Sequence, residues 1–109
     1  MSIPPLEKQP QVITSMDKKL QILNHGASVD QFGCYMIKGA IRNISPEPDI
    51  YAEITVDYFD SDGAQIDTEV DALTIPMPGG SRGFHIVYPG QRHDDVKSYK
   101  IYPSIKKTG

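Results

Sequence analysis

Three histidines and one cysteine are the side chains in this sequence that could act as a general base, a nucleophile or a transition-metal ligand: His25, His85, His93 and Cys34. A zinc site needs ligands at close, regular spacing, and these residues show neither a helical His-x-x-x-His nor paired cysteines. Cys34 lies in no known nucleophile signature, and a thiolate also needs a base within reach. His85 alternates with apolar neighbours and should face solvent, whereas His25 and His93 are expected in separate loops. The sequence therefore predicts no catalytic residue, no metal site and no cofactor.

Acidic residues around a glycine in the 60–69 region suggest a second kind of site, for calcium. Gly63 and Glu69 have the separation of positions six and twelve in an EF-hand loop. The first ligand position would then be Tyr58, which has no carboxylate, and the flanking residues predict strands rather than helices. A hairpin turn explains Asp60 and Gly63 better, because Asp accepts local backbone hydrogen bonds and Gly adopts a positive φ. A calcium-dependent surface site is the alternative.

Three aromatic side chains offer a binding surface rather than a reactive site. Tyr51, Phe59 and Tyr102 alternate with the apolar residues of their predicted strands, so we expect them to point away from the core. Tyrosine gives amphipathic contact area at low entropic cost, and outward tyrosines on neighbouring strands can stack on a carbohydrate or bind a protein. The sequence thus predicts Tyr51, Phe59 and Tyr102 as ligand-binding residues, the alternative being that they only cover a sheet.

Composition limits the classes of partner. The chain has 109 residues, with 11 Lys and Arg against 14 Asp and Glu, and a net charge of −3. Because the basic residues are scattered and a nucleic-acid surface needs them clustered, no nucleic-acid partner is expected. No run of apolar residues is long enough for a membrane-spanning helix, and no signal peptide is recognisable. A single cysteine cannot form an intrachain disulfide.

A two-residue alternation of apolar and polar side chains predicts the strands that carry these residues. It is clearest from Ile50 to Val70, where two alternating stretches flank the 60–63 turn and form a hairpin. The residues expected to face the core of this hairpin are Ala52, Ile54, Val56 and Tyr58, then Ile66, Thr68 and Val70.

Other strands are expected over residues 20–23, 33–44, 82–88 and 96–102, with a short edge strand within 11–14. The first should end at Asn24-His25-Gly26, and Gly39 within the second indicates a bulge or a close neighbour. About seven short strands separated by Pro- and Gly-rich turns predict an all-β antiparallel sandwich, with a closed barrel as the alternative. The domain should span 18–105, preceded by a flexible segment over 1–17 and followed by a tail over 106–109.

The order of motifs along these strands resembles one known family. A Y-x-x-x-G-x-I-x-N strand is followed by the Asp-Gly hairpin, a Pro-Gly turn and a final apolar strand; the residues are Tyr35, Gly39, Ile41, Asn43, Ile54 to Gly63, Pro78-Gly79, Phe84 and Val96 to Ile101. Over residues 33–103 the chain resembles the FxLYD domains, which are small immunoglobulin-like sandwiches of exported or surface-associated bacterial and archaeal proteins. The positions of the naming motif are occupied by Val56, Tyr58, Phe59 and Asp60. The water-stress and late-embryogenesis sandwiches share the Asn and the Asp-Gly hairpin and are the alternative family.

The resemblance implies an immunoglobulin-like sandwich without an established catalytic site, located outside the cytoplasm or in the cell envelope. With no reactive cluster in the sequence, we expect a non-catalytic interaction or spacer module rather than an enzyme. Such a module would bind a protein partner through a sheet edge or an aromatic face, and could form a weak homodimer by edge pairing. The alternative function is a small-ligand domain, for carbohydrate or dependent on calcium.

Overall fold

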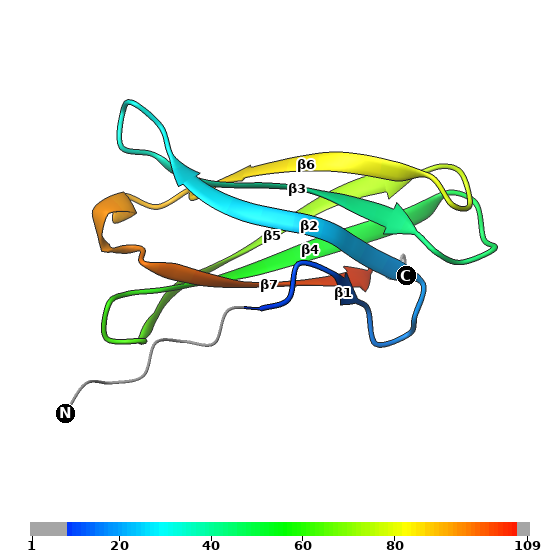
Figure 1. Ribbon diagram of the computed structural model, residues 1–109, viewed down its shortest axis with the longest axis horizontal. Helices are drawn as coiled ribbons and strands as arrows, with labels where there is room; N and C mark the ends of the chain where they lie inside the picture. Colours follow the sequence, from blue (N-terminus) through cyan, green and yellow to red (C-terminus); the bar gives the residue numbers. More distant parts are fainter. Residues whose placement is uncertain (1–8, 107–109) are drawn as a thin grey trace.

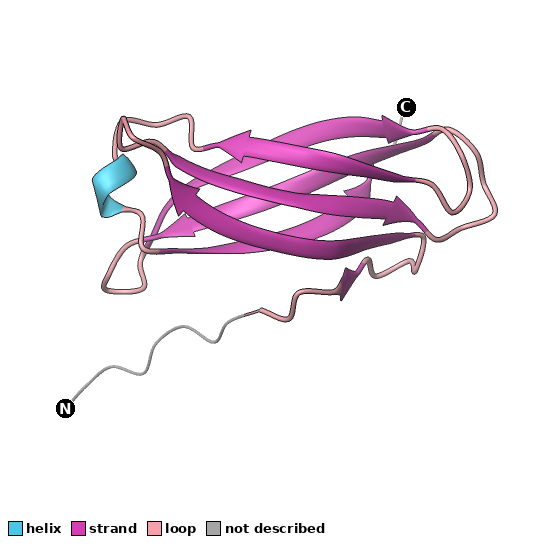
Figure 2. Ribbon diagram, turned by 45° about the horizontal axis from the view of Figure 1, so that its top comes forward, coloured by secondary structure: helices cyan, strands magenta, loops and turns pink. Residues whose placement is uncertain are grey.

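The computed structural model describes residues 9–106. Within these residues the chain forms seven strands in two antiparallel sheets that pack face to face, and one turn of 3-10 helix (Figures 1 and 2). The strand order is β1-β2-β3-β6 in the first sheet and β5-β4-β7 in the second. The predicted fold class, an immunoglobulin-like antiparallel β-sandwich of about seven strands, is confirmed. No helix in the described part of the chain is long and apolar enough to cross a membrane.

The elements in chain order are β1 (Ile13–Thr14), β2 (Leu20–Val29), β3 (Tyr35–Asn43), β4 (Ile50–Phe59), β5 (Gln65–Ile75), β6 (Ser81–Val87), η1 (His93–Asp95) and β7 (Ser98–Ile105). The turns of the β2–β3 and β4–β5 hairpins and the η1 turn lie at one end of the sandwich (Figure 1). The β1–β2, β3–β4 and β5–β6 connections lie at the other end. The two ends are therefore built from different loops, and the long sides of the sandwich are strand edges.

The core is the layer of apolar side chains between the sheets. Every second residue of β4 is buried, as the alternation predicts, and alternate residues of β2 and β3 meet them from the first sheet. Burial of each large aliphatic side chain contributes about 1.5–3 kcal/mol to folding. The largest wholly buried apolar side chains are Tyr58, Leu20, Ile22, Ile37, Ile41, Ile54, Ile75, Ile101 and Val56.

In strand β5, the face that packs against the core is the one that the sequence predicts to be exposed. Its odd-numbered residues from 67 to 71 lie opposite core-facing residues of β4, and opposite residues of an antiparallel ladder share a face. Thr68 and Val70 therefore point to solvent, and the prediction that they face the core is wrong, although Ile66 does pack against it. The cause is a register irregularity after Tyr58, where Ile66 is the extra residue of a bulge.

Strand β2 continues to Val29, past the end predicted at Asn24-His25-Gly26. A register shift between Ile22 and Asn24 accommodates one extra residue and lets pairing with β3 resume. Gly39 of β3 lies beside this bulge, against the Asn24 carbonyl oxygen and the ring of Phe84. The close neighbour predicted at Gly39 is thus confirmed, and the bulge lies in the facing strand β2 rather than in β3.

Residues 1–8 and 107–109 of the predicted terminal segments lie outside the described residues, so the flexibility expected of them stays a prediction. Between Gln9 and Thr14 the chain lies along the side of the sandwich where β2 and β7 meet (Figure 1). Ile13 and Thr14 pair with β2 as a short edge strand, which agrees with the one predicted within 11–14.

Candidate functional site

The three aromatic residues predicted to bind a ligand share the solvent-facing side of the second sheet but are spread along it. Tyr51 and Phe59 lie at the two ends of β4, and Tyr102 of β7 lies opposite Thr55, midway between them. At about 3.3 Å per residue, each ring is about 13 Å from the next along the strands. The exposed ring of Tyr51 is covered instead by Lys106, whose Nζ lies 5.0 Å from the ring centroid. The structure does not bring these three side chains into one patch.

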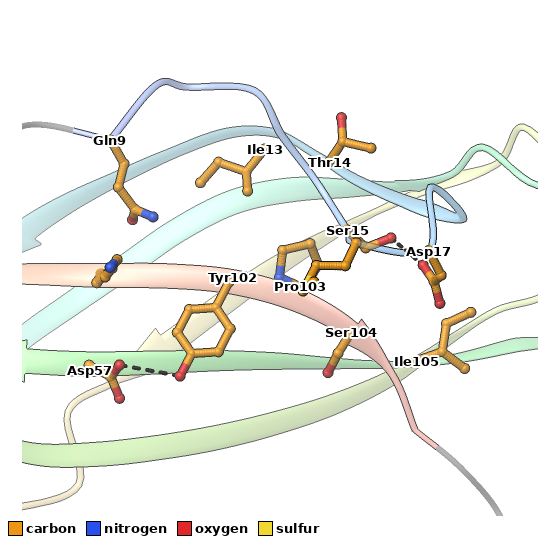
Figure 3. Close-up of a pocket in the computed structure, with 12 residues that line it drawn as sticks. Gln9, Ile13, Thr14, Ser15, Asp17, Asp57, Tyr102, Pro103, Ser104 and Ile105 are labelled. Atoms are coloured by element: carbon orange, nitrogen blue, oxygen red, sulfur yellow. Dashed lines mark hydrogen bonds between the residues drawn. The ribbon is translucent and has the colours of Figure 1, made fainter.

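Tyr102 lines a groove. The groove has a volume of about 920 Å³ and lies between β7 and the segment from Gln9 to Asp17 (Figure 3). The Tyr102 hydroxyl donates a hydrogen bond to Asp57 Oδ2 over 3.2 Å, and Thr68 Oγ1 donates to Asp57 Oδ1 over 2.8 Å. Partial burial and the Asp57 carboxylate raise the pKa of Tyr102. The bond to Asp57 thus orients the Tyr102 ring, which lines the groove.

His25 has a structural role in strand β2. Its ring is buried, with Nδ1 2.6 Å from the Tyr99 hydroxyl and Nε2 2.9 Å from the Pro10 carbonyl oxygen. A carbonyl oxygen can only accept, so Nε2 carries the proton and Nδ1 accepts the Tyr99 hydroxyl proton. The prediction that His25 lies in a loop is wrong, because the bulge in β2 keeps the strand paired through this position.

The other candidate reactive residues are dispersed. His93 lies in η1, where its Nδ1 accepts a hydrogen bond from the Tyr35 backbone N–H over 2.8 Å. His85 is exposed on β6, as predicted, and Cys34 is a half-buried free thiol after the β2–β3 turn. Within residues 9–106, no three His, Cys, Asp or Glu side chains are grouped so that they could hold a metal ion.

The free edge of β7 is closed by one side chain, that of Gln9. Its Nε2 donates to the Ile101 carbonyl over 3.0 Å, and its Oε1 accepts from the Ile101 N–H over 2.7 Å. These are the two bonds that a residue of a neighbouring strand would make. Two residues further on, Pro103 has no N–H to offer at the same edge. Strand β7 is thus a poor template for an added strand.

The edge of β2 is covered over most of its length. Strand β1 pairs with its first part, and Gln11 Oε1 accepts a hydrogen bond from the His25 N–H over 3.2 Å. Beyond His25, only Ala27 and Val29 direct their backbone groups outward, because alternate residues of β2 face β3. This leaves too short a row for extended pairing.

The edge of β5 is blocked by its own aspartates. The outward N–H of Thr68 donates to Asp67 Oδ1, and that of Ala72 donates to Asp71 Oδ1, each over 3.0 Å. Such local bonds compete with an incoming strand for the same donors. Inward-pointing charges on an edge strand also oppose pairing with another chain.

Strand β6 has none of these blocking features in the described part of the chain. It forms the outer edge of the first sheet and pairs only with β3. Tyr88 N–H donates to the Tyr35 carbonyl and Asn43 N–H to the Gly80 carbonyl, so the even-numbered residues of this stretch face β3. The residues whose N–H and C=O point outward are therefore Ser81, Gly83, His85 and Val87. Together they form a continuous row of donors and acceptors, which we call the β6 edge.

Next to the β6 edge, strand β5 points three carboxylates toward the space between the sheets. We call Asp67, Glu69 and Asp71 the acidic row. The Tyr88 hydroxyl donates to Asp67 Oδ2 over 3.2 Å, and the Tyr58 hydroxyl donates to Glu69 Oε2 over 3.3 Å. Neither ion pair found among residues 9–106 includes a carboxylate of the row. The row is therefore a line of negative charge that forms no ion pair within the part of the chain that the structure describes.

Burial raises the pKa of Glu69, and the nearby Asp71 and Asp67 raise it further, against the Tyr58 hydrogen bond, which lowers it. A carboxyl group whose pKa is raised by folding stabilises the protein below its unfolded pKa and loses that contribution as pH rises. The ionised Glu69 thus lowers stability near neutral pH relative to acid.

Replacing Glu69 with Gln is expected to raise the melting temperature near neutral pH by about 1–3 °C, because it removes a partly buried charge without removing the acceptor for Tyr58. The gain should vanish below about pH 4, where the wild-type carboxyl is protonated. Thermal denaturation at a series of pH values measures this. Glu53→Gln, on the solvent-facing side of β4, is the matched control and should show no such pH-dependent gain; equal behaviour of both variants would contradict the explanation.

Comparisons with known proteins found a similar fold in two solved structures. No family model and no curated protein matches the chain. The crystal structure of Campylobacter jejuni cj0090 is similar, with a TM-score of 0.64 and 17% identity over 90% of this chain and 100% of that one. A DUF1425 family member from Shewanella sp. pv-4 is also similar, with a TM-score of 0.58 and 12% identity over 90% of this chain and 98% of that one. At these identities the likeness shows the fold alone.

Sequence reasoning missed both the β6 edge and the acidic row. The spacing of Asp67, Glu69 and Asp71 at every second residue was visible in the sequence. It indicates three carboxylates on one face of a strand, but not that this face points inward.

Proposed function

We propose that this chain is a non-catalytic interaction module that binds a protein partner by strand addition at the β6 edge. The observation that carries the proposal is the contrast among the edges. Strands β7, β2 and β5 are capped by side chains or by β1, whereas no residue between 9 and 106 caps the backbone groups of the β6 edge. In strand addition, main-chain hydrogen bonds supply affinity and alternate side chains supply specificity.

The roles of the histidines support a binding function over a catalytic one. His25 and His93 use ring nitrogens to hold a backbone carbonyl and a backbone N–H, which ties them to the fold. A general base needs a ring nitrogen that can reach a substrate proton. Exposed His85 lies within the β6 edge, where it would contact an added strand.

The sequence motif supports a finer assignment, to an FxLYD-type domain of an exported or cell-surface protein. Val56 and Tyr58 stand at motif positions and are wholly buried in β4, the central strand of its sheet. Asp60 follows them, and its Oδ1 accepts the N–H groups of Asp62 and Ala64 in the hairpin turn. These roles explain the motif as a requirement of folding.

The proposal is tested with Gly83→Pro. Proline removes one outward N–H from the β6 edge but keeps the β3 ladder, and a Cβ at this position meets only the Gly39 carbonyl oxygen, at 3.7 Å. Random linear peptides displayed on phage are selected on the wild-type protein and then measured by fluorescence anisotropy. Selected peptides should bind Gly83→Pro at least about tenfold more weakly. They should also shift the amide NMR signals of Gly83, His85 and Val87.

The control in this experiment is Tyr102→Ser, which alters the groove and leaves the β6 edge intact. Equal binding by wild type and Gly83→Pro, with unchanged melting temperature, would overturn strand addition at β6. Loss of binding in Tyr102→Ser alone would favour the second candidate function, a small-ligand or peptide site in the groove. That candidate rests on the position of the Tyr102 ring, which Asp57 orients beneath a space of about 920 Å³.

A further inference from the structure

The acidic row lies along the β6 edge rather than at one point of it. Across the side opening of the sandwich, Arg82 Nη1 donates to the Thr74 carbonyl over 3.1 Å, and the Tyr88 hydroxyl donates to Asp67 Oδ2 over 3.2 Å. The first contact joins the start of β6 to the end of β5. The second joins Tyr88, the residue after β6, to the start of β5. Glu69 and Asp71 lie between the two contacts, so the row follows the whole length of β6.

A strand added to the β6 edge would extend the first sheet past this row. Because the Arg82 and Tyr88 contacts show that β6 itself faces β5, the added strand would lie one strand spacing, about 4.8 Å, beyond β5 on the open side of the sandwich. Every second side chain of that strand would point inward, toward the acidic row. The carboxylates of the acidic row also occur at every second residue of a strand. The inward side chains of the added strand and these carboxylates therefore have the same spacing.

The charge of the row determines which inward side chains it can accept. An apolar residue placed beside Glu69 would bury its carboxylate, whose hydrogen-bond partner among residues 9–106 is the Tyr58 hydroxyl. A buried charge without an opposite charge is costly. An acidic residue would add repulsion to that already present among the three. A lysine or arginine would pair with the carboxylates and has a stem long enough to bridge the sheets.

A second copy of this chain fits the site poorly. Antiparallel pairing of two β6 edges would point Phe84 and Ile86 of each copy inward beside Arg82, supplying two apolar residues for each basic one. It would also bring two acidic rows into one interface. A separate basic segment therefore suits the site better than self-association.

We infer that the partner of this module is an extended segment with lysine or arginine at every second position, whose basic side chains enter the side opening of the sandwich and pair with Asp67, Glu69 and Asp71. This inference rests on the proposed strand addition at β6 and adds the chemistry of the partner.

The test uses synthetic peptides and the full chain. A fluorescent peptide of alternating lysine and threonine is compared with one that has glutamine in place of lysine, and with one that has the same composition but all lysines in one block. The alternating lysine peptide should bind at least about tenfold more tightly than either control. Its affinity should fall as salt rises from about 0.05 to 0.5 M.

Two protein variants separate the inference from the proposed function. D67N/E69Q/D71N should lose the preference for alternating lysine, whereas E53Q/D62N/D94N, which removes the same number of charges elsewhere, should keep it. Gly83→Pro should weaken peptide binding at least about tenfold, as for the selected peptides. If Gly83→Pro weakens binding but the glutamine peptide binds as well as the lysine peptide, the charge inference is overturned and strand addition stands. If no peptide binds, or if Gly83→Pro binds normally, both are overturned; a concentration-dependent dimer lost in Gly83→Pro would replace the basic partner with a second copy.

Discussion

Replacing Asn43 with alanine is expected to lower the free energy of unfolding by about 3 kcal/mol. Asn43 is wholly buried at the end of β3. Its Nδ2 donates to the Glu47 carbonyl over 2.7 Å, and its Oδ1 accepts from Ser45 N–H over 2.9 Å and from Ser45 Oγ over 2.7 Å. Alanine would leave these groups unpaired beside a cavity.

The measurement is urea or thermal denaturation, with an expected fall in melting temperature of roughly 12–24 °C for this size of domain. Asn24 supplies the matched control, because its side chain is exposed on β2 and Asn24→Ala should change stability by less than about 0.5 kcal/mol. Similar losses in the two variants would show that the Asn43 network is not the cause.

Replacing Gly39 with alanine is expected to cost about 3 kcal/mol, through overlap rather than lost bonds. A Cβ at Gly39 would overlap the Asn24 carbonyl oxygen and the ring of Phe84. The carbonyl belongs to the bulge of β2 and cannot retreat without breaking the β2–β3 ladder, so the clash is not relieved by a rotamer change.

Gly26→Ala is the control for this variant, since Gly26 lies in the same sheet and a Cβ there meets nothing within 4 Å. It should be neutral or slightly stabilising, because alanine loses less backbone freedom on folding. Denaturation of the two variants side by side measures the difference, and a stable Gly39→Ala protein would contradict the close approach at this position.

The strands of the core were predictable because their residues obey a two-residue period. In β4 the buried side chains of Ile54, Val56 and Tyr58 alternate with polar ones, and in β6 Phe84 and Ile86 do the same. The face of β5 was not predictable by this rule. Apolar residues alternate there too, but the bulge at Ile66 shifts the ladder by one residue and turns them outward.

The candidate site was harder to predict because it depends on contacts between distant residues. The capping of β7 joins Gln9 to Ile101, 92 residues away, and nothing in the local sequence of either residue indicates the other. Likewise, Tyr51, Phe59 and Tyr102 were correctly expected to point away from the core, but their separation follows from the register of β4 and β7. Periodicity predicts which face of a strand a side chain lies on. Which side chains of neighbouring strands lie next to it depends on how the strands pair.

The bidentate contact between Gln9 and Ile101 has a consequence for stoichiometry. A sandwich that leaves a long edge open on each side can accept neighbours from both directions and grow into a ribbon. Here the Gln9 amide group occupies the position of the missing neighbour on the β7 side, which leaves β6 as the open edge among the described residues. An assembly built on β6 would then stop at a single pair of chains.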